Sequence, residues 1–257
     1  MKNIDYDKIR GKKVLLYSGG MDCYIINRLE NPDVLLFIDN KSNYSSMEKE
    51  LLLKRKETDE SLKNLVIVED FINMSLIERD DYIIPSRNAY FILKAAEYGD
   101  EIILGATAGD RSTDKDIRFA NMMTDLLNHI YEDSHWCKGG RHIKVNFKYK
   151  ECTKKDLIEM FMKKYNLSGE ETARILMENS SSCYDFKDGK PCGTCKPCTR
   201  KWLAILGATG VDTGQYFDTH PRSYFTPETI EQWIDRESGP NNRGRESEEI
   251  ITTLKSL

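Results

Sequence analysis

Short apolar runs alternate with stretches of helical periodicity through the first part of the chain. The runs VLLY, VLLFID, LVIVED and IILGA begin at Val14, Val34, Leu65 and Ile102. Between and after them, helical patterns cover residues 22–30, 46–56, 87–98 and 117–131. Strands that are buried on both faces read as continuous apolar runs, and parallel strands need a crossover helix between them. The pattern therefore predicts an α/β fold with an open parallel sheet, which binds ligands at the carboxyl ends of its strands.

The second part of the chain has mainly helical signals. A further strand is expected near Val145, followed by a helix through DLIEMFMKKY. Ser168 and Glu171 form an S-x-x-E capping box for another short helix. KWLAILG reads as a helix that Gly207 stops, and Thr226 with Pro227 starts a helix that runs through Trp233. The polar segment ESGPNNRGRESEE is expected to be a flexible connection.

Four cysteines form a C-x8-C-x2-C-x2-C cluster, made of Cys183, Cys192, Cys195 and Cys198. Zn²⁺ prefers four tetrahedral thiolates in structural sites, and Gly193 supplies the backbone freedom of a tight turn that presents several sulfurs to one ion. Two disulfides are the alternative. The odd count of seven cysteines and a charged first segment without the apolar run of a secretory signal favour the metal. With four protein ligands the zinc would be structural, and it would stabilise the C-terminal region.

The charge balance argues against large anionic partners. The 257 residues carry a net charge of −4 and the pI is near 5.7, so we expect no broad nucleic-acid surface. No apolar run approaches the roughly 18 to 20 residues that span a bilayer. We therefore expect a cytoplasmic protein without membrane contact, and small-molecule chemistry is the better expectation.

A glycine-containing loop, Ser18-Gly19-Gly20-Met21-Asp22-Cys23, follows the first predicted strand directly and opens a predicted helix. Glycines let the backbone approach a phosphate closely, and the N–H groups and dipole of a helix start favour its negative charge. A Gly-Gly pair alone is typical of many strand-to-helix turns, but Ser18, Asp22 and the strand context favour phosphate binding. The G-K-[ST] ending of a Walker A loop is absent. Cys23 is either an ordinary loop residue, which is the plainer interpretation, or a low-pKa nucleophile at a helix start.

Two motifs together resemble one family. SGGMDC resembles the SGGxDS pyrophosphate loop of the N-type ATP pyrophosphatases (the PP-loop superfamily), and SCY-x7-CGTCKPCTR is similar to the metal motif of the 7-cyano-7-deazaguanine synthase (QueC) family. Further matches to that family are IPSRN from Ile84 against V-P-G-R-N, Asp110, Ser112 and Asp116 against D-x-S…D, and Thr153-Lys154 against T-K. The resemblance runs from about Val14 to Ala204.

This resemblance implies a fold, cofactors and a reaction. The fold would be of the HUP (adenine nucleotide alpha hydrolase) type, with residues 1–150 as an ATP-binding PP-loop domain and residues 151–257 as a helical zinc-binding region packed on it. The cofactors would be ATP, Mg²⁺ and Zn²⁺, the substrates 7-carboxy-7-deazaguanine and ammonia, and the assembly a homodimer. ATP would adenylate the carboxylate with loss of pyrophosphate. Ammonia would then form the amide, and a second ATP would drive its dehydration to the nitrile, 7-cyano-7-deazaguanine, in queuosine or archaeosine biosynthesis.

The resemblance and the strand ends also assign roles to particular residues. Catalytic roles are implied for Ser18, Asp22 and Lys154. Binding of ATP and its Mg²⁺ is implied for Ser18, Gly19, Gly20, Met21, Asp22, Cys23, Asp39, Arg87 and Gly105. Substrate binding is implied for Arg87, Asn88, Asp110, Ser112 and Asp116. A surface helix cation and a solvated lysine are the alternative interpretations of Arg87 and Lys154.

Two departures from the family pattern keep other functions open. Cys23 replaces the last serine of the loop, and Thr113 to Asp116 replaces the family's G-Y-P-D. The second change lies where the family contacts its substrate. An enzyme that joins the deazaguanine acid to a protein amine, as QueC-like proteins of antiphage systems do, is therefore a second hypothesis. Sulfur transfer to tRNA is a third, which the loop and Cys23 suggest and the acidic pI disfavours.

Overall fold

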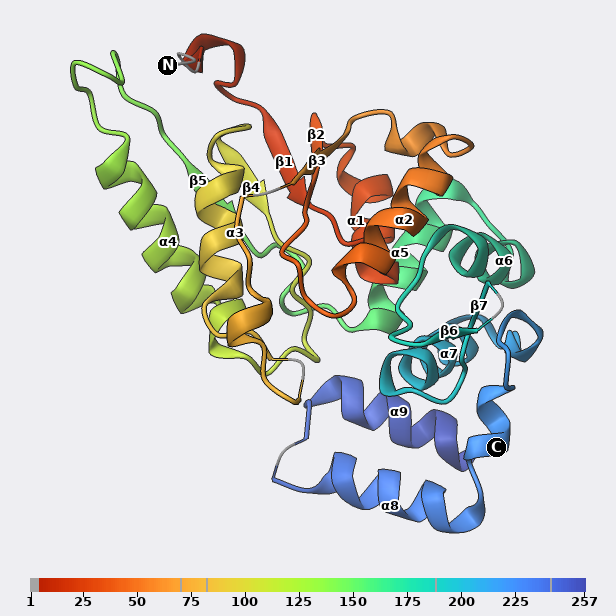
Figure 1. The fold of residues 1–257 in the computed structure, drawn as a ribbon. Coiled ribbons are helices and arrows are strands. Elements are labelled where there is room, and N and C mark those ends of the chain that lie inside the picture. Colours follow the sequence, from red (N-terminus) through yellow and green to blue (C-terminus); the bar gives the residue numbers. More distant parts are fainter. Residues whose placement is uncertain (1–4, 70, 82, 188, 241) are drawn as a thin grey trace. The chain divides into compact units, whose positions relative to one another are not determined.

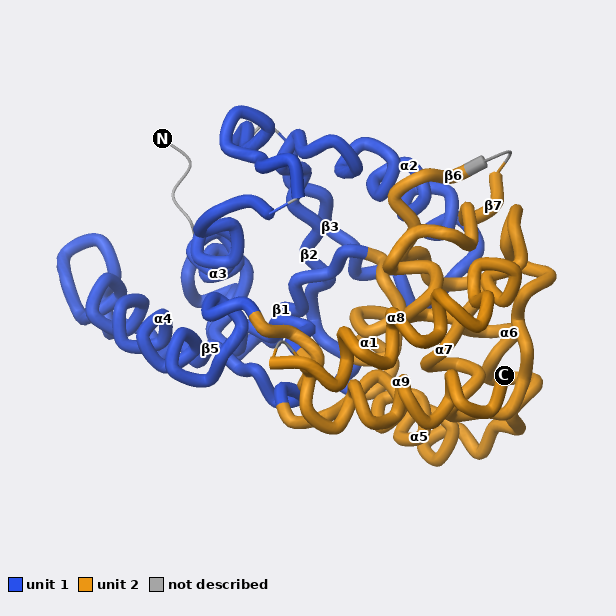
Figure 2. The backbone as a smooth tube through the Cα atoms, turned by 90° about the horizontal axis from the view of Figure 1, so that it is seen from below, with its two compact units in different colours: residues 1–18, 30–106, 112–150 blue, residues 19–29, 107–111, 151–257 orange. Residues whose placement is uncertain are grey.

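The computed structural model describes residues 5–69, 71–81, 83–187, 189–240 and 242–257, and Figure 1 shows the course of the chain. The residues form two compact units, which Figure 2 colours separately. Unit 1 is made of Met1–Ser18, Glu30–Ala106 and Ser112–Lys150, and unit 2 of Gly19–Leu29, Thr107–Arg111 and Glu151–Leu257. The division into domains 1–150 and 151–257 stays a prediction. The two units follow other boundaries, since two short segments before residue 150 belong to unit 2.

Unit 1 is built on a five-stranded parallel sheet, as the alternating apolar runs predict. Its strands in chain order are β1 (Lys13–Leu16), β2 (Val34–Ile38), β3 (Leu65–Val68), β4 (Glu101–Ile103) and β5 (Lys144–Asn146). Their order in the sheet is β3-β2-β1-β4-β5, and Val14 pairs with Val34 on one side and with Ile102 on the other. The strand order reverses between β1 and β4. Open α/β sheets bind ligands at such a reversal, beyond the carboxyl ends of the strands.

Both faces of this sheet are buried. Ile92 of α3 and Leu127 of α4 pack in one core cluster with Val14, Leu36 and Ile102 of the strands, so these two helices cover one face (Figure 1). Strand residues of the opposite parity are buried as well, among them Leu15, Leu35 and Ile103. The helices of unit 1 are α2 (Ser45–Lys56), α3 (Arg87–Ala95) and α4 (Ile117–Ile130), with the 3₁₀ turns Tyr6–Lys8, Glu60–Leu62, Ser75–Ile77 and Thr113–Lys115.

Unit 2 is mainly helical. Its α-helices are α1 (Met21–Glu30), α5 (Lys154–Tyr165), α6 (Gly169–Asn179), α7 (Lys196–Thr209), α8 (Pro227–Ser238) and α9 (Arg245–Lys255). The remaining elements are the antiparallel hairpin β6 (Phe186–Lys187) and β7 (Lys190–Pro191) and the 3₁₀ turns Gly214–Tyr216 and Pro221–Tyr224. The capping box predicted at Ser168 and Glu171 is present at the start of α6, and Thr153 with Asp156 forms a second one at α5. At the centre of the unit, Trp202 is fully buried and stacks on Phe225.

Two predictions about the C-terminal part are wrong. The helix through KWLAILG does not stop at Gly207 but continues to Thr209, where Gly210 adopts a φ of +72°. The segment ESGPNNRGRESEE is not a flexible connection, because α8 continues to Ser238 and α9 begins at Arg245. Glu246 and Ser247, in that segment, are buried. Asn241 lies outside the described residues.

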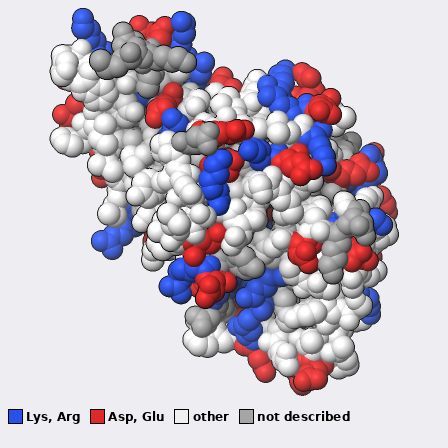
Figure 3. All heavy atoms as spheres, viewed as in Figure 1, with Lys and Arg blue, Asp and Glu red and all other residues white. Residues whose placement is uncertain are grey.

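Smaller deviations concern element ends. Helix α3 ends at Ala95, three residues before the predicted end, and strand β5 stops at Asn146, so the rest of VNFKY forms a turn. Within the described ranges, no helix is long and apolar enough to cross a membrane. On the face drawn in Figure 3, basic and acidic side chains are interspersed.

Candidate active site and metal cluster

The SGGMDC loop leaves β1 and leads into α1. Gly19 has a φ of +76°, a conformation that glycine adopts without strain. Its carbonyl accepts a hydrogen bond of 2.9 Å from the Ser181 N–H. Because α1 begins at Met21, the outward-pointing N–H groups of its first turn and the positive end of its dipole lie at the loop. Such a helix start can bind a phosphate group.

Lys154 and Asp22 meet beside this loop, in unit 2. Lys154 is the first residue of α5, and its ammonium donates to Asp22 Oδ2. The other carboxylate oxygen, Asp22 Oδ1, is buried and has no hydrogen-bond partner among the described residues. Mg²⁺ binds through one or two carboxylates together with substrate phosphates. An unpaired carboxylate oxygen at a phosphate-binding helix start therefore fits that ion.

The charge of Lys154 is maintained by its neighbours. Burial lowers the pKa of Lys154, but the carboxylates of Asp22, Glu246 and Asp110 outweigh burial and raise the pKa above its ordinary value. The ammonium therefore stays protonated throughout the neutral range. A permanent cation beside a helix start that can bind phosphate could stabilise the charge of a leaving pyrophosphate.

Asp39 lies directly after β2, at the carboxyl edge of the sheet in unit 1. Its side chain is buried and accepts hydrogen bonds from Ser45 Oγ at 2.8 Å, Lys49 Nζ at 3.0 Å and Lys41 Nζ at 3.1 Å. Burial would raise the pKa of Asp39, but these hydrogen bonds hold it well below its ordinary value. The carboxylate is therefore ionised, and these hydrogen bonds all come from residues of unit 1. Its contact with ATP stays a prediction.

Arg87 begins α3, at the same edge of unit 1. Its guanidinium donates to the Tyr44 hydroxyl at 2.7 Å. Burial raises the pKa of Glu48 to about 7, and the charge of Arg87 opposes that effect. Ser86 precedes Arg87 with a φ of +61°, in the place of the glycine of the family's V-P-G-R-N. The left-handed backbone explains why a glycine suits that position.

Two of the predicted substrate residues of unit 1, Asn88 and Ser112, contact Asp114, to which the sequence motifs assign no role. The buried Asn88 donates to Asp114 Oδ2 at 2.9 Å, and the Ser112 hydroxyl donates to Asp114 Oδ1. Asp116 caps the start of α4 by accepting from the Phe119 N–H at 2.7 Å. One oxygen of Asp116 therefore has a helix-capping role. Substrate contacts of Asn88, Ser112 and Asp116 stay predictions.

Two other predicted residues follow β4. Gly105 is partly buried, two residues beyond the end of the strand in unit 1. Asp110 belongs to the short segment of unit 2, where its Oδ2 accepts from the Thr107 N–H at 2.9 Å. The structure therefore brings Asp110 into the electrostatic field of Lys154, and it brings Ser112 to Asn88.

The four clustered cysteines of unit 2 converge on one point. The sulfurs of Cys183, Cys192, Cys195 and Cys198 all lie within 4.8 Å of one another, and none of the seven cysteines, all within the described ranges, forms a disulfide. A tetrahedral zinc site with Zn–S bonds of about 2.3 Å separates its sulfurs by about 3.8 Å. The N–H groups of Asp185 and Cys192 each donate to Cys183 Sγ at 3.2 Å. The donor set and its spacing fit Zn²⁺.

Backbone geometry and hydrogen bonding prepare this cluster for a metal. Gly193 has a φ of +82°, and a Cβ there would lie 1.7 Å from the Thr219 carbonyl oxygen, so only glycine fits between the ligands. Hydrogen bonds from the thiols of Cys183 and Cys198 lower the pKa of Cys195. A cluster that already stabilises one thiolate is suited to a cation.

Helix α9 and the residues before it add groups that the sequence analysis missed. Arg243 Nη1 donates to the Gly109 carbonyl at 2.6 Å, and Glu246 is buried at 3% exposure. The charged composition of this stretch resembles a linker. The four-residue spacing of Ile250 and Leu254 indicates a buried helix face, and Glu246 lies one turn before Ile250 on that face.

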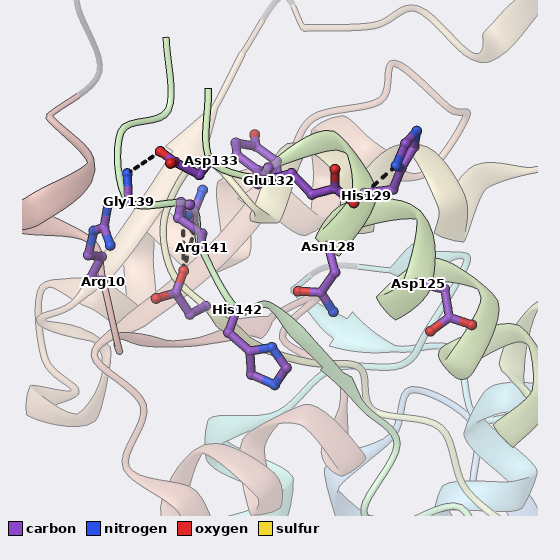
Figure 4. Close-up of a pocket in the computed structure, with 12 residues that line it drawn as sticks. Arg10, Asp125, Asn128, His129, Glu132, Asp133, Gly139, Arg141 and His142 are labelled. Carbon is purple, nitrogen blue, oxygen red and sulfur yellow. Dashed lines mark hydrogen bonds and ion pairs between the residues drawn. The ribbon is translucent and has the colours of Figure 1, made fainter. Parts of the chain in front are cut away.

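A hollow lies in unit 1 at the amino ends of strands β4 and β5, and Figure 4 draws the residues that line it. Its volume is about 750 Å³, and none of the predicted site residues lines it. The side chain of Arg141 is fully buried there and donates to Asp100 Oδ1 at 2.8 Å and to the carbonyls of Ala96 and Gly99. Because this hollow lies at the amino ends of the strands, it is not at the edge where open sheets bind ligands.

Fold and cluster together define an α/β protein of the HUP type with a C-terminal Cys₄ group that can hold zinc. The family described as queuosine biosynthesis protein QueC matches residues 58–207, more than half of the chain, and the chain belongs to this QueC family. No curated protein and no solved structure matches the chain. The matched range contains Arg87, Lys154 and the four clustered cysteines. It begins after the SGGMDC loop and ends before α8 and α9.

Family membership establishes the general chemistry. The chain is an ATP-using enzyme of the ATP pyrophosphatase type, from a family of 7-deazaguanine biosynthesis that acts on small molecules with ammonia.

Proposed function

We propose that this enzyme adenylates the carboxylate of 7-carboxy-7-deazaguanine and converts it with ammonia to the amide and then to 7-cyano-7-deazaguanine. A carboxylate resists attack by an amine. Transfer of the adenylyl group from ATP to the carboxylate, with release of pyrophosphate, gives the acyl carbon a good leaving group, AMP.

One observation carries the proposal. The SGGMDC loop and Thr153-Lys154 separately resemble motifs of the same family, and Lys154 contacts Asp22 although the two residues are 132 positions apart. Neither motif alone identifies a site, because each is short. Their meeting at the start of two helices supports a single centre that handles the pyrophosphate of ATP.

Each of these residues has a defined part in the proposed reaction. The helix start at Gly19 to Cys23 binds the β- and γ-phosphates, and Lys154 stabilises the charge that develops on the pyrophosphate as it leaves. Asp22 would hold Mg²⁺, and this ion would neutralise phosphate charge and polarise the α-phosphoryl group. Zn²⁺ held by the four clustered cysteines would stabilise unit 2 and take no part in the reaction, because four protein ligands leave no open position. Homodimer formation remains a proposal.

Product analysis tests the acceptor. Incubation with 7-carboxy-7-deazaguanine, ATP, Mg²⁺ and ammonium should yield the amide and then free nitrile, with AMP and pyrophosphate. Mass spectrometry of the small-molecule and protein fractions decides the result. Scarce nitrile together with a protein that gains the mass of the acyl group would contradict the proposal and support the protein-conjugating alternative, which shares the activation step.

A further inference from the structure

A small cavity lies inside unit 2, between helices α5, α7 and α9. Its volume is about 20 Å³, which is enough for a single molecule of the size of water. Part of its lining is aliphatic, from Leu203 and Ala204 of α7 and Ile250 of α9. Its polar lining includes Lys154 and Glu246. The cavity therefore offers a charged end and an apolar wall to a very small ligand.

Glu246 is the unusual member of this lining. It is 3% exposed, and neither of its carboxylate oxygens has a hydrogen-bond partner among the described residues. Arg243 Nη1 lies 4.0 Å from Glu246 Oε1, which is too far for a hydrogen bond. Burying a carboxylate without hydrogen bonds is costly. A buried acid that keeps two open acceptors therefore points to a ligand or a proton that it receives.

The position of this carboxylate is fixed by its surroundings. A Cβ at Gly109 would lie 2.1 Å from Glu246 Oε2, so any side chain at residue 109 would displace the carboxylate. Arg243 donates to the Gly109 carbonyl at 2.6 Å and holds the two segments together. Glu249, one helical turn later, is by contrast engaged by the Thr153 hydroxyl at 3.0 Å.

The cavity adjoins the proposed pyrophosphate centre through Lys154, which lines it and also donates to Asp22. Burial raises the pKa of Glu246, Asp22 adds to this effect, and the cations Lys154, Arg243 and Arg200 oppose it without cancelling it. The charged groups around Glu246 and the cavity are Lys154, Lys155, Arg200, Arg243, Glu249, Asp22 and Asp110. A carboxyl group in this field is a better base than an exposed glutamate.

We propose that this cavity holds the ammonia that attacks the acyl-adenylate, and that Glu246 is the base that removes a proton from ammonium. This inference rests on the proposed function. Ammonium transfers one proton to the carboxylate, which becomes a carboxylic acid. The freed nitrogen lone pair then forms the C–N bond, the C–O bond to AMP breaks with its electron pair on the AMP phosphate, and a second proton passes from the nitrogen to solvent.

Size and charge favour ammonia over a metal ion here. Mg²⁺ demands six oxygen ligands and retains several waters, whereas the cavity has room for one small molecule. The nearby cations Lys154 and Arg243 favour neutral ammonia over ammonium in the cavity, and this assists the transfer of a proton to Glu246.

The test separates adenylation from amine attack. ATP–pyrophosphate exchange that depends on 7-carboxy-7-deazaguanine reports the first step, and amide formation at varied ammonium concentration reports the second. Glu246→Gln should leave exchange within about twofold of the wild type and lower amide formation about 10²-fold at neutral pH. The loss of amide formation in Glu246→Gln should become smaller as pH rises, because free ammonia then becomes abundant. Glu248→Gln, the same change at an exposed position of α9, should leave both unchanged.

Two controls make the result decisive. Glu246→Gln should melt at or above the temperature of the wild type, because it removes a buried charge that makes no hydrogen bond among the described residues. A loss of activity then cannot come from unfolding. Ammonium chloride should stabilise the wild type more than sodium chloride does, and this difference should vanish in Glu246→Gln.

Unchanged amide formation in Glu246→Gln would overturn the inference. An equal loss of exchange and amide formation would also overturn the inference, because Glu246 would then act on the SGGMDC loop or on Lys154 and not on ammonia. Absence of exchange in the wild type would instead be a failure of the proposed function. In that event the ammonium-dependent stabilisation still decides whether the cavity is an ammonia site.

Discussion

Replacing Asp22 with asparagine is expected to lower carboxylate-dependent ATP–pyrophosphate exchange by about 10²- to 10³-fold, the range found when one preorganised electrostatic group at a developing charge is lost. Asparagine keeps the size of the side chain but removes the charge that faces Lys154 and that would hold Mg²⁺. Zinc content should stay unchanged, because the Cys₄ cluster involves other segments of the chain. Exchange kinetics and elemental analysis of the same preparation check both statements.

Asp235→Asn provides the matched control for this variant, because it makes the same change on an exposed position of α8. It should exchange pyrophosphate at the wild-type rate. Exchange at a normal rate in Asp22→Asn would contradict the assignment of the loop. A large drop in melting temperature would show that the Asp22–Lys154 pair is mainly structural.

Replacing Cys195 with serine is expected to remove the bound zinc and to lower the melting temperature sharply. Three thiolates and a hydroxyl form a much poorer zinc site than four thiolates. Because binding of a structural zinc is coupled to folding, its loss should destabilise the protein by several kcal/mol, about 3 or more. Elemental analysis should find about one zinc per wild-type chain and none in the variant.

Cys152→Ser is the control for that experiment, since Cys152 is a free, partly buried cysteine outside the cluster. It should keep its zinc and melt close to the wild type. Well-folded wild-type protein without zinc, or equal melting of the two serine variants, would refute the metal assignment.

The central sheet could be predicted from the sequence because its strands are buried on both faces. Such strands need no alternation, so the runs from Val14, Val34, Leu65 and Ile102 mark the starts of β1 to β4 within one residue. Helix α6 could be placed from its capping box, which joins two residues only three positions apart, Ser168 and Glu171. These signals are local, and local signals can be read without knowing the partner elements.

The end of α7 could not be predicted, because the glycine that suggested it has a tertiary role. A Cβ at Gly207 would lie 2.7 Å from Thr253 Oγ1, so this glycine permits the close approach of α7 and α9 and does not end the helix. The polar composition of this segment predicts a flexible connection where α9 begins. Without that helix, the reason for Gly207 was not visible.

The candidate site likewise contains residues that local motifs predict and residues that only tertiary packing places. Motif residues such as Asp22, Lys154 and the clustered cysteines are marked by type and spacing, and the structure brings Asp22 to Lys154 and the cysteines to one another. Glu246 and Arg243 carry no motif. Their placement depends on how α9 packs against α7 and against Gly109, and no local pattern reports such packing.

The fate of the carboxylate oxygens tests the central claim, adenylation of the 7-carboxyl group, most directly. With both oxygens of that group labelled as ¹⁸O, attack on the α-phosphoryl group of ATP joins one of them to phosphorus, and the amine then displaces AMP that carries it. We predict that each AMP released in amide formation contains one heavy oxygen and that the pyrophosphate contains none. Unlabelled AMP, or heavy oxygen in inorganic phosphate, would contradict adenylation, because the acid would then be activated by another route or would not be the substrate.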